Sequence, residues 1–152
     1  AFAAVAEILI YLYRANNADD LAGKSRDDIV REWMGDNAAA PASVPLNANF
    51  SEVVSAITEG RKGAVAVLDL DGTLAGIVTD GDLRRAFQRD TTNLTAADIM
   101  GPNPITVDPD ARMSDVVDLL TANKIANLFV VEDGRPTAIV HIAELMQAGY
   151  VA

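Results

Sequence analysis

The fold class that the sequence predicts is mixed α+β (α/β), with two copies of a β-α-β-β-α unit related by pseudo-twofold symmetry and preceded by a helix. The first observation is a repeat, because the apolar pattern of residues 44–67 recurs at 107–130 with a constant offset of 63 positions. The second is that each copy combines helical spacing with two short apolar runs. Since an open solenoid needs about three repeats or more, two copies favour paired modules with a cleft between them, where ligands commonly bind.

Each copy is read element by element from its apolar spacing and its turn residues. In the first copy, Phe50, Val53 and Ile57 lie at helical spacing behind Asn49 or Ser51 as the N-cap. The expected elements of this copy are a helix at 50–60, strands at 64–68 and 74–79 joined by a turn at 69–72, and a helix at 80–88. The expected elements of the second copy are a strand at 105–107, a helix at 113–122, strands at 128–131 and 137–140, and a helix at 142–148. Residues 41–48 separate the opening helix from the first copy, and residues 89–94 link the copies.

Composition excludes several classes of function. The formal charge of −10 disfavours a broad surface for nucleic acid or anionic membrane, because both require clustered Lys and Arg. The chain has no cysteine and one histidine, which rules out disulfides and thiolate metal sites and leaves a poor basis for zinc. We therefore expect a cytoplasmic protein without a bound metal.

The opening segment 1–13 is almost wholly apolar but shorter than the about 20 residues that span a bilayer. We expect a helix that packs within this chain or on a second copy, or that ends an upstream domain. The expected domains are an N-terminal helix with linker at 1–27, a first repeat at 28–90 and a second repeat at 91–152.

Two strings carry a resemblance to a known family. The residues Ile-Met-Gly-Pro-Asn-Pro-Ile-Thr-Val at 99–107 and Gly-Ile-Val-Thr-Asp-Gly-Asp-Leu-Arg-Arg at 76–85 resemble a tandem cystathionine-β-synthase (CBS) domain pair, or Bateman module, across residues 28–152. Within that superfamily, residues 79–85 and 144–151 are similar to the C-terminal regulatory region of arabinose-5-phosphate isomerases. The sequence departs from these enzymes at 141–144, where His-Ile-Ala-Glu replaces His-Met-His-Asp, and at 20–25, which lack the Pro-Gly-Gly linker.

The resemblance implies a regulatory part of an enzyme of Kdo and lipopolysaccharide synthesis, itself without catalytic activity. The implied effector is a nucleotide or nucleotide-sugar, either CMP-Kdo or an adenine nucleotide such as AMP or ATP. It also implies a homodimer or a higher homo-oligomer built through CBS pairs. The alternatives are the CBS pair of a sugar nucleotidyltransferase and a pure oligomerisation module.

The candidate ligand-binding residues lie where the second strand of each hairpin meets a helix. Thr79 ends a strand and Asp82 lies in the first helical turn, so a hydroxyl and a carboxylate converge there, and Arg84 or Arg85 could supply positive charge. The alternative is that Asp82 only caps the helix and the arginines are solvated. His141 and Glu144 occupy the equivalent positions of the second copy. The resemblance adds contacts near the strand starts, at Ala64, Ile105, Thr106 and Asn127.

One motif argues for an enzyme. The string Asp-Leu-Asp-Gly-Thr at 69–73 follows an apolar strand, as in haloacid-dehalogenase-type phosphatases, where the first Asp is the nucleophile. Against this, the string leads at once into a second apolar strand, and its repeat partner is the plain turn 132–135. Such an enzyme also needs a distant lysine and a further acidic pair for magnesium, and Lys124 is the only later lysine. We therefore predict a hairpin turn at 69–72.

Overall fold

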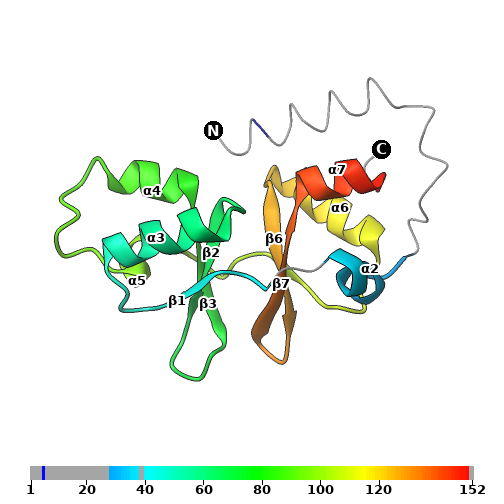
Figure 1. The fold of residues 1–152 in the computed structure, drawn as a ribbon, viewed down its shortest axis with the longest axis horizontal. Helices are drawn as coiled ribbons and strands as arrows, with labels where there is room; N and C mark the ends of the chain where they lie inside the picture. The colour runs from blue at the N-terminus through cyan, green and yellow to red at the C-terminus, as the bar shows by residue number, and fades with distance from the viewer. Residues whose placement is uncertain (1–4, 6–27, 38–39, 151–152) are drawn as a thin grey trace. The chain divides into compact units, whose positions relative to one another are not determined.

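The computed structural model describes Val5 and residues 28–37 and 40–150 (Figure 1). The helix and linker predicted for 1–27 lie outside the described residues, apart from Val5. The described chain forms two compact units: unit 1 comprises residues 28–37, 105–130 and 138–150, and unit 2 comprises residues 40–104 and 131–137. Within the described residues, no helix has the length and apolar character that crossing a membrane requires.

Unit 2 is built on a four-stranded sheet in the order β1-β2-β3-β4. These strands span Ser43–Pro45, Ala64–Leu68, Leu74–Thr79 and Gly101–Pro102. Strand β1 runs parallel to β2, with Val44 opposite Val67, whereas β2 and β3 are antiparallel. Helices α3 (Phe50–Gly60), α4 (Asp80–Ala86) and α5 (Ala96–Ile99) lie together on one side of this sheet (Figure 1).

Local sequence signals explain where helix α3 begins and ends. The Asn49 Oδ1 accepts the backbone N–H of Glu52 at 2.8 Å, and the two residues form a reciprocal capping box. Arg61 ends the helix in the left-handed conformation with φ of 57°. The inner face of the helix contributes Val53 and Ile57 to a core with strand and α5 side chains; the other buried members are Val44, Ala48, Val65, Val67, Val78, Leu83, Ala86, Leu94, Ala96 and Ile99.

Unit 1 is built on the strands of the second copy. Strands β5 (Thr106–Val107), β6 (Asn127–Glu132) and β7 (Arg135–His141) form one sheet in that order, and the tip of the β6–β7 hairpin at 131–137 belongs to unit 2. Helices α2 (Val30–Asn37), α6 (Met113–Asn123) and α7 (Ile142–Ala148) lie on one side of β6 and β7 (Figure 1). The buried core contains Val30, Trp33, Val107, Met113, Val116, Val117, Leu120, Ala126, Leu128, Val130, Ala138, Val140, Ile142, Leu145 and Tyr150.

The two copies repeat each other in hydrogen bonding as well as in element order. Val107 lies opposite Val130 in the parallel β5–β6 pair, the same register as in β1–β2. The Asp80 N–H donates to the Gly63 carbonyl at 3.1 Å, and the Ile142 N–H donates to the Ala126 carbonyl at 2.7 Å. The predicted α+β class and repeated unit are confirmed. The segment 41–48 is more than a separator, because β1 lies within it.

Helix α2 precedes the first copy in sequence but belongs to unit 1, with the second copy. Helix α5 precedes the second copy but belongs to unit 2, with the first copy. Residue Ile29, just before α2, forms a bridge with Arg112, the N-cap of α6 in the second copy. Thr95, just before α5, forms the corresponding bridge with Asn49, the N-cap of α3 in the first copy. The compact units are therefore discontinuous in sequence. The boundaries 28–90 and 91–152 stay a prediction about sequence repeats, and the spatial relation of the two copies stays a prediction as well.

Candidate ligand-binding site

The junction of β3 and α4 brings Thr79 and Asp82 into direct contact. Thr79 is the last residue of β3 and the N-cap of α4. The Asp82 Oδ2 accepts the Thr79 backbone N–H at 2.9 Å and the Thr79 hydroxyl at 3.0 Å, while the Asp82 N–H donates to Thr79 Oγ1 at 3.3 Å. Asp82 therefore caps helix α4, as the alternative role predicted.

The second carboxylate oxygen of Asp82 faces a cation. Its Oδ1 accepts a hydrogen bond from Arg85 Nη2, and the Asp82 side chain is 16% exposed whereas Arg85 is 72% exposed. A carboxylate can accept about four hydrogen bonds and this one has three described, so one acceptor position remains for a ligand hydroxyl. Capping and ligand binding by Asp82 are thus compatible, and the second role stays a prediction.

A pocket of about 230 Å³ adjoins Asp82 on the side of α5. Its lining combines two carboxylates with two guanidinium groups: Asp82, Arg85, Ala86, Arg89, Asp98 and Ile99. The backbone N–H of Thr95 and then its hydroxyl donate to Asp98, which lowers the pKa of that carboxyl, with a smaller contribution from Arg89. Arg89 and Asp98 are not among the residues predicted from sequence. The sequence does contain a pattern that indicates Asp98, because Thr95 and Asp98 have the same Thr-x-x-Asp spacing as Thr79 and Asp82.

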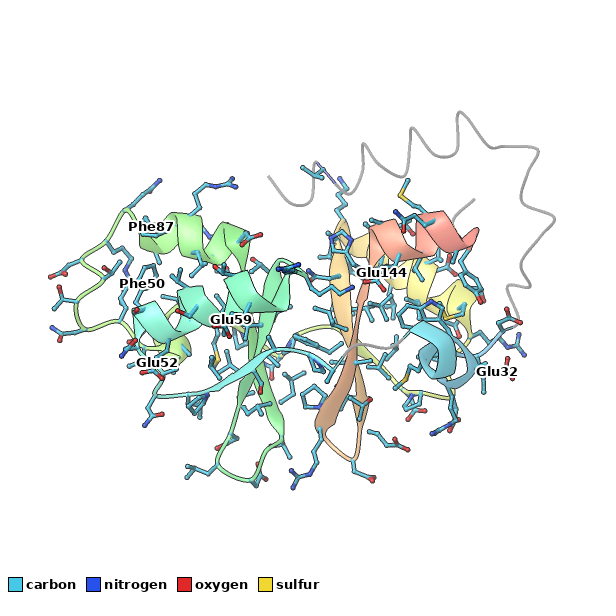
Figure 2. The ribbon with its side chains drawn as sticks, in the orientation of Figure 1. Glu32, Phe50, Glu52, Glu59, Phe87 and Glu144 are labelled. Atoms are coloured by element: carbon cyan, nitrogen blue, oxygen red, sulfur yellow. The ribbon has the colours of Figure 1, made fainter. Side chains whose placement is uncertain are left out.

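The junction of β7 and α7 is built differently although it occupies the equivalent position. His141 is the N-cap of α7, and its Nδ1 accepts the Ala143 backbone N–H at 3.1 Å. A neutral His141 in this arrangement carries its proton on Nε2. Glu144, labelled in Figure 2, lies in the first turn of α7 and is half-buried. This copy therefore offers an imidazole and a longer carboxylate where the first offers a hydroxyl and an aspartate.

The secondary candidates lie at the starts of strands. Ala64 is buried at the start of β2 and pairs with Thr79 across the ladder. Asn127 is 6% exposed at the start of β6, the only buried polar residue among those described. Ile105 is half-buried just before β5, and Thr106 is exposed and lies opposite Phe129 of β6.

The structure thus gathers the predicted residues into two groups, one in each unit. Unit 2 contains Ala64, Thr79, Asp82 and Arg85, and unit 1 contains Ile105, Thr106, Asn127, His141 and Glu144. In each group the junction residues adjoin a strand start, through the Ala64–Thr79 pair in unit 2 and the Ile142–Ala126 hydrogen bond in unit 1. The binding role of both groups stays a prediction.

The phosphatase-like string forms the predicted hairpin turn. The Asp69 N–H donates to the Thr73 carbonyl at 2.8 Å, and the Gly72 N–H returns to the Asp69 carbonyl at 3.0 Å. The Asp71 Oδ1 accepts both the Thr73 hydroxyl at 2.6 Å and the Thr73 N–H at 3.1 Å. Across residues 28–37 and 40–150, no group of three His, Asp or Glu residues is placed to hold a metal ion. The hairpin turn predicted at 69–72 is therefore confirmed.

Comparison with known proteins gives one consistent result. The profile of the CBS domain family matches residues 26–89 and 96–150. Arabinose 5-phosphate isomerase KpsF of Escherichia coli is 38% identical over 90 residues, which cover 58% of this chain and 28% of that protein. Arabinose 5-phosphate isomerase KdsD of Pseudomonas aeruginosa is 35% identical over 109 residues, which cover 70% and 33%. The chain therefore spans about a third of the length of these curated relatives.

Solved structures of CBS domains share the fold at low sequence identity. The CBS domain pair of MJ0100, in complex with 5-methylthioadenosine and S-adenosyl-L-methionine, has a TM-score of 0.69 at 23% identity, over 80% of this chain and 97% of that one. CBSX2 in complex with AMP has a TM-score of 0.66 at 22% identity, over 79% and 94%. The CBS-domain protein ATU1752 of Agrobacterium tumefaciens reaches 0.70 at 21% identity, over 80% and 93%.

Proposed function

The chain belongs to the CBS domain family, and from that premise we propose that it is the ligand-binding regulatory region of an arabinose-5-phosphate isomerase. The observation that carries this proposal is the 38% identity with the KpsF isomerase over 90 residues, compared with 23% for the MJ0100 pair and 22% for CBSX2. The region forms and breaks no bond in this proposal. Catalysis belongs to an attached isomerase domain in the cytoplasm.

We infer that the effector is a nucleotide or a nucleotide-sugar. The Asp82 Oδ1 would accept a sugar hydroxyl, Thr79 would contact a hydroxyl or phosphate, and Arg85 would pair with phosphate charge. In the second copy His141 and Glu144 would take the corresponding contacts. The strand-start residues Ala64, Ile105, Thr106 and Asn127 would contact the rest of the ligand.

The proposed ligands are CMP-Kdo, AMP and ATP. CMP-Kdo suits a regulator that senses the end product of the pathway in which the parent isomerase works. AMP and ATP suit the structural relatives, since CBSX2 has been crystallised with AMP and the MJ0100 pair with two adenosine compounds. Each candidate joins a phosphate or other charged group to a sugar with free hydroxyls, the chemistry that the two junctions offer.

The proposed mechanism is a shift between two arrangements of the parent protein. A ligand that binds one arrangement more tightly shifts the ratio of the two populations toward it, at saturation by the ratio of the two affinities. A homodimer of CBS pairs would transmit this shift between subunits. An oligomerisation module without a ligand, and the CBS pair of a sugar nucleotidyltransferase, are the alternatives.

Calorimetric titration with CMP-Kdo, AMP and ATP tests the proposal, on the native chain and on Asp82→Ala and Glu144→Ala. A third variant, Glu52→Ala, removes an equivalent capping contact from α3 without touching either junction. We expect saturable binding that either junction variant weakens at least tenfold and that Glu52→Ala leaves unchanged. Absence of binding by all three ligands would refute the effector and favour the oligomerisation module.

A further inference from the structure

A second pocket, of about 320 Å³, lies in unit 2 away from the predicted junction residues. It is formed where the two hairpin turns approach the segment that leads into β1. Its lining residues are Ala40, Pro41, Ser43, Leu68, Gly72, Arg135, Pro136 and Thr137. None of them belongs to the sets predicted from sequence, so a ligand here would go beyond the proposed function.

The two hairpin turns that border the pocket are held together by a hydrogen bond and by close packing. The Leu74 N–H donates to the Gly134 carbonyl at 2.8 Å, linking the β2–β3 hairpin to the tip of the β6–β7 hairpin. A β-carbon at Gly134 would lie 3.1 Å from the Thr73 methyl group, so the turns are also closely packed. Gly72 has φ of 83°, which disfavours any other residue at this point.

The side chain of Arg135 is held against the first turn. A β-carbon at Gly72 would collide with the Arg135 guanidinium group, which shows that the guanidinium lies directly on the backbone of that glycine. Only glycine leaves this space. The position of the cation therefore depends on a residue 63 positions away, in the equivalent turn of the first copy.

The Arg135 guanidinium is the only charged group of the lining, and no hydrogen bond or ion pair ties it to another described residue. The guanidinium interacts electrostatically with the Asp71 carboxylate. That carboxyl has a lowered pKa mainly because Thr73 donates two hydrogen bonds to it, and Arg135 contributes the smallest effect. Among the described residues Arg135 therefore interacts with Asp71 at longer range but has no hydrogen-bonded or ion-paired acid, in a chain whose formal charge is −10.

The rest of the lining suits the carbon skeleton of a small ligand. Leu68, Pro41 and Pro136 are apolar lining residues, and Ser43 and Thr137 are the uncharged polar ones. A planar guanidinium group pairs with two oxygens of a carboxylate or phosphate at once. The volume is at the small end of the range for ligand pockets, about 300–1,000 Å³. We propose that this Arg135 pocket binds a small organic anion, with the oxyanion on Arg135 and a short carbon skeleton against the prolines.

The test is a titration of the ¹⁵N-labelled full chain with glycerol 3-phosphate and, separately, with succinate, followed by NMR. The native chain should show saturable shifts of the Arg135 side-chain N–H and the Gly72 amide. Arg135→Gln should weaken binding at least tenfold, whereas Arg135→Lys should weaken it less because it keeps the charge. Arg61→Gln is the matched control, since Arg61 is an exposed arginine of the same unit outside the pocket.

Each outcome decides a separate point. Binding of one probe alone assigns the pocket to phosphates or to carboxylates. Equal affinity in Arg135→Gln and the native chain, or equal weakening by Arg61→Gln, would overturn the proposal. Retained dispersion of the amide spectrum verifies that each variant is folded. Arg135→Gln should leave the titration with AMP and CMP-Kdo unchanged, so this inference and the proposed effector site fail independently.

Discussion

Replacement of Trp33 by alanine tests whether the leading segment of the chain completes the core of the second copy. Trp33 lies in α2, is 3% exposed and packs in the cluster that also contains Met113 and Leu145. A buried aromatic side chain removes about 150–250 Å² from water. At about 25 cal/mol per Å² this area corresponds to about 4–6 kcal/mol. Because measured Trp→Ala changes in cores cost about 3–5 kcal/mol, we expect a loss near 4 kcal/mol.

Urea unfolding followed by far-ultraviolet circular dichroism measures this loss. Fluorescence is unsuitable for the variant because Trp33 is the only tryptophan of the chain. Trp33→Phe is the control, because it keeps most of the apolar area and should cost roughly 1–2 kcal/mol, less than half of the loss in Trp33→Ala.

Amide hydrogen exchange shows where the stability is lost. In Trp33→Ala we expect protection to fall at Phe129 of β6, which belongs to unit 1, more than at Val65 of β2, which belongs to unit 2. A loss of protection confined to β2, or a stability change below about 1 kcal/mol, would refute the assignment of α2 to the core of the second copy.

Three further changes have definite expected outcomes. Gly76→Ala should destabilise the chain by about 1–3 kcal/mol in urea unfolding, because its β-carbon would lie 2.9 Å from the Gly101 carbonyl oxygen of the neighbouring strand. Thr95 hydrogen bonds lower the pKa of Asp98 below 3.8 in the folded state, so the stability from this group is present above pH 3.8 and lost as pH falls through the lower folded value. Asp98→Asn should flatten the acid limb of a stability–pH curve, and an unchanged limb would contradict this. Lys124→Gly should raise the melting temperature, because Lys124 caps α6 with φ of 54°, where glycine is favoured by about 1 kcal/mol; a decrease would show that its side-chain contacts outweigh the backbone strain.

Sequence periodicity predicted most elements of the fold because each element is decided by neighbouring residues. The helix behind Asn49 follows from apolar positions three and four apart and from one capping side chain, both visible in the sequence. The turn at 69–72 follows from Asp and Gly between two apolar runs, and the antiparallel β2–β3 pair confirms it. The repeat offset then gave the second copy its strands and helices.

The exchange of leading segments could not be predicted in the same way. Periodicity shows that one face of 30–37 is apolar, but it does not specify which copy of a repeated core covers that face. Both copies present similar apolar surfaces, so the choice depends on the length and path of the connecting chain. The β4 strand of two residues was missed because it is too short to carry an alternating pattern.

The contact between the candidate residues Thr79 and Asp82 was predicted from sequence, whereas the Arg135 pocket was not. Thr79 and Asp82 do form one junction, and both roles considered for the carboxylate fit its geometry. The Arg135 pocket was missed because its charge and its glycine come from turns of different copies. Taken one copy at a time, the sequence contains only an Asp-Gly turn at 71–72 and a Gly-Arg pair at 134–135, and neither pattern indicates a ligand.

The hydrogen bond from the Tyr150 hydroxyl to Asp28 Oδ2, 3.0 Å long, joins residues 122 positions apart. The Asp28 carbonyl also accepts the Met113 N–H at 2.8 Å, so this early residue meets both α6 and the end of the described chain. During synthesis α2 is made before α6 and α7, so its buried side chains Val30 and Trp33 stay uncovered until residues 113–150 have been made. Unit 1 should consequently fold after the 40–104 segment of unit 2, and a nascent chain stopped before α6 should be a substrate for chaperones.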